Sequence, residues 1–108
     1  FKIIHCDEFQ TEGTDKIAKR IKKRVGNNPL YLSIDIDVLD PAFAPGTGTP
    51  EIAGMTTREM VNVLRGLSGL NLVSADVVEV SPAYDHAEVT SLAAATIVYE
   101  LTNLFAKS

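Results

Sequence analysis

Apolar and polar residues follow one another along the chain in blocks whose spacing predicts alternating strands and helices. An isoleucine-rich run predicts a short strand at residues 1–6. A second run, apolar on both faces, predicts a strand at residues 30–36 that is buried in a parallel sheet. A third run, rich in β-branched residues, predicts another buried strand at residues 72–80.

Helical spacing is found between and after these runs. Apolar residues on one face predict a helix that is capped by Thr14 or Asp15 and ends at Gly26. Thr56 and Glu59 have the spacing of a capping box, which predicts that a second helix begins there. A third helix, largely packed, is predicted in the segment after the last strand, which is rich in Ala and Leu. The order of elements predicts a three-layer α/β/α fold around a parallel sheet.

Two carboxylates lie at the end of the second predicted strand. Asp35 and Asp37 are two residues apart, so a regular strand would place both side chains on one face. Ligands of open parallel sheets bind beyond the carboxyl ends of the strands, and adjacent carboxylates repel each other unless a cation neutralises them. Mg²⁺ or Mn²⁺ suits such oxygen ligands. The spacing alone leaves two interpretations open: a metal site, or a turn cap beside a solvated carboxylate.

Other candidate residues lie in and after the third predicted strand. Glu79 falls within that strand, where its carboxylate can bind a guanidinium through two hydrogen bonds or form a structural ion pair. His86 lies at a loop-to-helix junction and is a candidate for the rim of a pocket. The loop at residues 45–51 lacks the Gly-Lys-Ser/Thr ending of a phosphate-binding loop, so it is either a pocket lining or a tight connection. Asp40 is interpreted as a turn former.

The composition is that of a globular domain. The 108 residues are 45% hydrophobic and 22% charged, and the net charge of −4 gives no indication of a nucleic-acid partner. No apolar run approaches the ~20 residues that cross a bilayer, so no membrane partner is expected. Cys6, the only cysteine, excludes a disulfide within the chain and a cysteine-based zinc site. Because Phe1 begins an apolar run without a methionine, we expect a piece of a longer protein.

The aspartate segment resembles a family signature. Ser-Ile-Asp-Ile-Asp-Val-Leu-Asp-Pro at residues 33–41, continued by Pro-Gly-Thr-Gly-Thr-Pro at residues 45–50, is similar to the third signature of the ureohydrolases, the arginase and agmatinase family. Residues 78–82, with Tyr84 and Asp85, resemble the family's later strand and loop. The resemblance covers nearly the whole chain. It implies that residues 1–108 are the C-terminal part of a single arginase-type catalytic domain, with the upstream part absent.

The resemblance also implies an activity: hydrolysis of a guanidino compound to urea and an amine with two Mn²⁺ ions. Asp35 matches the aspartate that bridges both ions, and Asp37 matches the aspartate that ligates one of them. We further hypothesise that Asp37 helps to move the proton. Glu79 matches the glutamate beside the guanidinium group, and His86 is assigned with it to substrate binding. The family's two upstream signatures, which supply four further ligands, do not occur here, so this chain alone is expected to be catalytically incomplete.

Two departures from the family bear on substrate and loop geometry. Arginases usually have alanine at the position of Gly46, so the agmatinase branch is favoured, with agmatine converted to putrescine. Ala53 stands where the family usually has glycine, which leaves the local loop geometry open. The alternatives are a guanidinobutyrase or related amidinohydrolase, or an inactive ureohydrolase-like binding or regulatory subunit. The family implies a homo-trimer or hexamer, and we expect a cytoplasmic protein, with a mitochondrial location also open.

Overall fold

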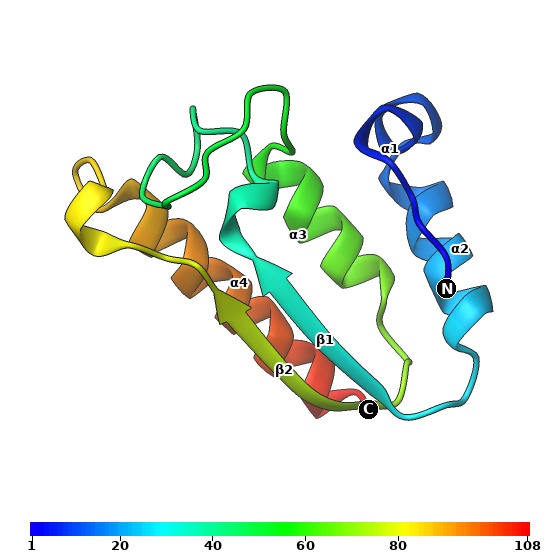
Figure 1. Ribbon diagram of the computed structural model, residues 1–108. Helices are drawn as coiled ribbons and strands as arrows, with labels where there is room; N and C mark the ends of the chain where they lie inside the picture. The colour runs from blue at the N-terminus through cyan, green and yellow to red at the C-terminus, as the bar shows by residue number, and fades with distance from the viewer.

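The computed structural model describes the whole chain, Phe1–Ser108. Its elements in chain order are α1 (Cys6–Glu12), α2 (Thr14–Val25), β1 (Leu30–Asp35), the 3-10 helix η1 (Ile36–Val38), α3 (Thr57–Gly66), β2 (Leu72–Val78), the 3-10 helix η2 (Pro82–Tyr84) and α4 (Val89–Ala106). Figure 1 shows the two strands side by side, with α4 running along them and α3 between the sheet and the α1–α2 pair.

The sheet consists of β1 and β2, which pair in parallel with Asp35 opposite Val78. Helix α3 makes the connection between them, as parallel pairing requires. One face of the sheet, including Ile34 and Val77, packs against a core that α2, α3 and α4 share. The chain is therefore α/β with a parallel sheet as predicted, and it contributes two of the three predicted layers, because its helices cover one face only.

The opposite face of the sheet corrects the prediction that β1 is apolar on both sides. Tyr31 and Ser33 point there, and both donate hydrogen bonds to Asp76 of β2, from Ser33 Oγ over 2.6 Å. This face is polar and open to solvent, with Tyr31 57% exposed. The predicted burial of the third strand is also wrong: in β2 only Leu72 is buried, because no helix covers its outer side.

The predicted strand at residues 1–6 is wrong as well. Residues 1–5 have no regular secondary structure, and α1 begins at Cys6. A strand needs a neighbour to hydrogen-bond its main chain, and the sheet contains β1 and β2 alone. Phe1 and Ile3 are consequently exposed. An apolar run alone therefore did not identify a strand.

Local signals placed the helix ends with mixed success. The capping box of α3 is confirmed: Thr56 Oγ1 accepts from Glu59 N over 3.0 Å, and Glu59 Oε1 accepts from Thr56 N over 2.9 Å. Gly26 ends α2 as predicted. The predicted side-chain cap of α2 is wrong, because Gly13 occupies the cap position and offers no side chain.

Helix α4 is packed on one side only. By length and composition alone it is the one helix of the chain that could cross a membrane, a property that core helices share. Its buried Glu100 forms an ion pair with Arg65 of α3, with 2.8 Å between Oε1 and Nη2. Leu92 and Tyr99 on its outer side are 69% and 65% exposed. The prediction that this helix is largely packed is therefore wrong, because only its inner face packs against the core.

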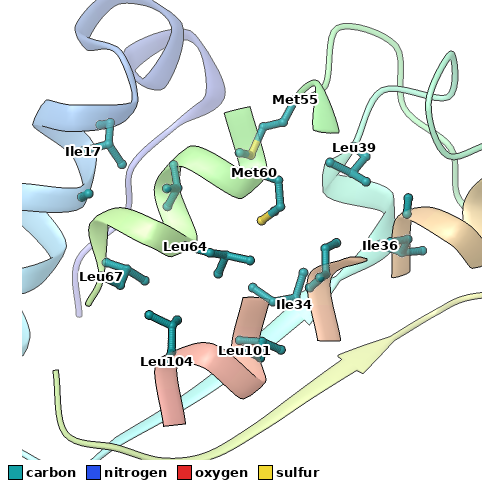
Figure 2. Packing of buried hydrophobic residues seen from close by; sticks show 14 of the residues in the cluster. Ile17, Ile34, Ile36, Leu39, Met55, Met60, Leu64, Leu67, Leu101 and Leu104 are labelled. Carbon is teal, nitrogen blue, oxygen red and sulfur yellow. The ribbon is translucent and has the colours of Figure 1, made fainter. Parts of the chain in front are cut away.

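The core supports the segment that follows β1. Figure 2 shows Ile34, Ile36 and Leu39 pointing into the same apolar cluster as Leu64 of α3 and Leu101 of α4. Ile36 and Leu39 are 0% and 1% exposed. Full burial of such a side chain stabilises the fold by about 1.5–3 kcal/mol. These two anchors lie on either side of Asp37 and fix the main chain that carries both aspartates.

Candidate metal centre

Asp35 and Asp37 lie where β1 ends and the main chain turns. Asp35 is the last residue of the strand and caps η1, with its Oδ1 accepting from Asp37 N over 3.2 Å. The regular strand that would have aligned the two side chains stops at Asp35, so the 3-10 turn sets their relation instead. Thr49 Oγ1 donates to Asp37 Oδ2 over 2.6 Å. Asp35 thus has the capping role that the sequence left open, and both carboxylates keep oxygen atoms for another partner.

The electrostatics of this site are unbalanced. Asp35 is exposed overall, but partial desolvation of its carboxylate raises its pKa, and the neighbouring Asp37 and Glu79 carboxylates raise it further, although the Asp37 N–H opposes them. Asp35, Asp37 and Glu79 form no ion pair. The ion pairs of the chain join Arg20 to two glutamates and Arg65 to one. Negative charge without a counter-ion favours binding of a cation.

The donor set fits a divalent metal in kind but not in number. Carboxylate oxygens suit Mn²⁺ and Mg²⁺. The chain contains no group of three or more His, Cys, Asp or Glu side chains arranged to hold a metal ion. Asp35 and Asp37 can therefore contribute ligands to a centre that needs others from outside this chain.

Glu79 lies just past β2, not inside a strand as predicted. The strand ends at Val78, the partner of Asp35, so Glu79 is at the same edge of the sheet as the aspartates. Its φ of 70° is in the left-handed region, which costs a residue with a side chain roughly 1–2 kcal/mol. Such strain at a residue whose charge also acts on Asp35 is typical of functional sites.

His86 is exposed, and only its main chain is held: its N–H donates to Asp85 Oδ1 over 2.9 Å. An apolar cavity of about 470 Å³ lies between α3, α4 and Phe43, and it includes neither His86 nor Glu79. The two residues predicted to bind substrate therefore lie outside this cavity.

The loop at residues 45–51 forms the tight connection, one of the two alternatives that its sequence left open. Gly46 and Thr47 are buried in a tight connection, and Gly46 O accepts from Ser81 N over 2.7 Å. Further on, Thr49 reaches Asp37. Asp40 forms the predicted turn, because its Oδ1 accepts from Ala42 N over 2.9 Å. Sequence reasoning missed the part played by Asp85 here, although an aspartate just ahead of a predicted helix is a capping signal.

Comparison with known proteins decides the family, since residues 1–103 match the model of the arginase family. The chain belongs to the arginase family. It is 61% identical over 108 residues to a Schizosaccharomyces pombe protein, covering 100% of this chain and 27% of the relative. It is 52% identical to an agmatinase of Photorhabdus laumondii and 51% identical to a guanidinopropionase of Pseudomonas aeruginosa, covering 96% and 99% of this chain and 34% of each relative.

Solved structures show the same fold. The proclavaminate amidino hydrolase of Streptomyces clavuligerus superposes with a TM-score of 0.96 at 46% identity, covering 98% of this chain and 35% of that one. The predicted family and the arginase-type α/β fold are therefore confirmed. The chain spans about a third or less of the length of the relatives that it matches. The rest of each relative has no counterpart in this chain.

Proposed function

We propose that the protein containing this chain is a manganese-dependent ureohydrolase, and that residues 1–108 supply the C-terminal part of its single catalytic domain. The observation that carries this proposal is the group of three carboxylates without a counter-ion, Asp35, Asp37 and Glu79, where two parallel strands end. Membership of the arginase family supplies the reaction class. The homo-trimer or hexamer and the cytoplasmic location remain proposals that rest on the family resemblance.

Each carboxylate has a separate role in this proposal. Asp35 and Asp37 would hold two Mn²⁺ ions together with ligands from the upstream part. Bound metal ions lower the pKa of water and orient it for attack on the substrate. Asp37, steadied by the hydroxyl of Thr49, would help to move the proton. Glu79 would hold the guanidinium through two hydrogen bonds, since that planar group matches two carboxylate oxygens. His86 would border the substrate.

Agmatine, converted to putrescine and urea, is the proposed substrate, because the chain is 52% identical to one agmatinase and 50% identical to others. A related guanidino acid is the second candidate, because the guanidinopropionase is almost as similar at 51%. An inactive subunit of a ureohydrolase-like complex is the alternative from another class.

The test measures urea release by the full-length protein with added Mn²⁺, from agmatine and from guanidinopropionate. Asp35→Asn should lower release at least ~100-fold, since loss of partners around metal ligands already costs 10–100-fold. Asp15→Asn, which removes one exposed carboxylate on α2, is the matched control and should leave the rate unchanged. The 108-residue chain alone should release no urea. A full-length protein that binds guanidino compounds without hydrolysing them would favour the inactive subunit.

A further inference from the structure

Two segments of the chain meet at a single residue, Gly46. Its N–H donates to Thr90 Oγ1 of α4 over 2.8 Å, and its C=O accepts from Ser81 N over 2.7 Å. Both Gly46 and Thr90 are buried, Thr90 completely at 0% exposure. We refer to Gly46, Ser81, Asp85 and Thr90 as the Gly46 clamp.

The clamp leaves no room for a side chain at its centre. A Cβ on Gly46 would lie 2.9 Å from Asp85 Cβ and 3.0 Å from Asp85 Cα. The second of these atoms is main chain, so a rotamer change cannot relieve the contact. Glycine at position 46 is what allows the two loops to approach this closely.

Asp85 holds the clamp together. Its carboxylate accepts from the main-chain N–H groups of His86, Thr90 and Ser91 over 2.9, 2.9 and 3.0 Å, and from Ser91 Oγ over 3.2 Å. Two of these N–H groups belong to the first turn of α4, whose formal cap, Glu88, gives no side-chain hydrogen bond. Asp85 therefore fixes the helix end that presents Thr90 to Gly46.

The clamp joins the two segments that carry or contact the candidate catalytic groups. Gly46 is three residues before Thr49, the residue that donates to Asp37 Oδ2. Ser81 is two residues after Glu79, whose charge acts on Asp35. One short path through Gly46 thus connects the loop that steadies Asp37 with the segment that carries Glu79.

We propose that the Gly46 clamp sets the position of Glu79 relative to Asp35 and Asp37, and that Asp85 is its main positioning residue. The proposal rests on the proposed function, in which Glu79 holds the guanidinium. The aspartates themselves are anchored by the buried Ile36 and Leu39, outside the clamp. Loosening the clamp therefore displaces Glu79 more than it displaces the aspartates, and weakens substrate binding more than metal binding.

The test compares three variants of the full-length protein. Asp85→Asn keeps the size of the side chain but replaces one acceptor oxygen by a donor, and Thr90→Val removes the acceptor for Gly46 N–H. Thr56→Val, the matched control, removes the side-chain cap of α3, a helix outside the clamp. Each is measured for KM with agmatine, for the Mn²⁺ concentration that gives half-maximal activity, and for hydrogen exchange at the amides of residues 46 and 81.

The clamp predicts faster exchange at both amides in Asp85→Asn and Thr90→Val, and unchanged exchange there in Thr56→Val. KM should rise about 10-fold in the two clamp variants, since small displacements of binding groups are costly, with the Mn²⁺ requirement unchanged. Unchanged exchange, or faster exchange with an unchanged KM, overturns the proposal. If the wild-type protein releases no urea while the exchange pattern holds, the proposed function fails and the clamp stands as the connection between the loops.

Discussion

Asp35, Asp37 and Glu79, the unbalanced set of carboxylates, differ from Asp85 in how their negative charge is compensated. The pKa of Asp35 is raised, because partial desolvation and the neighbouring carboxylates outweigh the hydrogen bond that it accepts from Asp37 N–H. Burial acts on Asp85 in the same direction, but the hydrogen bonds that its carboxylate accepts outweigh it and hold its pKa well below the usual range. A carboxylate that accepts hydrogen bonds from several N–H groups stabilises the fold. A carboxylate whose neighbours are also negative remains available to bind a cation or a substrate.

The largest effect should follow from Asp37, in the unbalanced set. Asp37→Asn keeps the shape of the side chain but removes its charge, and should lower urea release by the full-length protein at least ~100-fold. Thr49→Val, which removes only the hydrogen bond to Asp37 Oδ2, is the companion variant and should have a smaller effect. Full activity in Asp37→Asn would contradict the proposed proton-moving role.

Alanine at position 46 tests the close packing of Gly46 against Asp85. Gly46→Ala forces a Cβ against Asp85 and should lower the free energy of unfolding by about 1–3 kcal/mol, as overpacking does. Gly48→Ala is the matched control, because a Cβ there meets nothing within 4 Å. Urea denaturation of both variants measures the difference. Equal free energies of unfolding for Gly46→Ala and Gly48→Ala would contradict this prediction, because they would mean that the loops at Gly46 move apart without cost.

The loss of folding stability at acidic pH should depend on Asp85. Because its pKa is lowered in the folded state, its contribution to stability is present above the unfolded value of about 3.9 and is lost as pH falls toward the folded value. Asp85→Asn should therefore be less stable than wild type at pH 6, and its stability should fall less steeply below pH 4. Melting temperatures recorded across this range measure it, and parallel curves for the two proteins would contradict the assignment.

The smallest effect is expected at Ala53, whose N–H is met by Asp40 Oδ2 over 3.0 Å. Its φ of 70° lies in the left-handed region, at the position where glycine was expected from the family. Ala53→Gly should raise the free energy of unfolding by up to about 1 kcal/mol, because relief of the strain exceeds the lost chain entropy. Ala42→Gly, at a residue without positive φ, should lower it, and a gain in both variants would refute the explanation.

Features encoded by neighbouring residues could be predicted from the sequence, and features that depend on distant partners could not. Thr56 and Glu59 cap each other across one turn, so their spacing sufficed. The run at residues 1–6 has strand-like composition, but pairing needs a neighbouring strand that no local pattern supplies. The polar face formed by Tyr31, Ser33 and Asp76 likewise depends on how β1 and β2 meet.

The candidate site divides in the same way. Asp35 and Asp37 were found because the two aspartates follow an apolar run and match a family signature. The Gly46 clamp was missed because its members lie up to 44 residues apart and meet only after α4 packs. Glu79 was identified as a residue, but its place just past β2, with positive φ, comes from the chain's turn toward Ser81.

Manganese binding to the full-length protein, measured by titration calorimetry, tests most directly whether Asp35, and not Asp85, is a metal ligand. Wild type, Asp35→Asn and Asp85→Asn are compared under identical conditions. The structure predicts that Asp35→Asn loses binding at one site or more, whereas Asp85→Asn binds as wild type does. Wild-type binding in Asp35→Asn, or lost binding in Asp85→Asn, would contradict it.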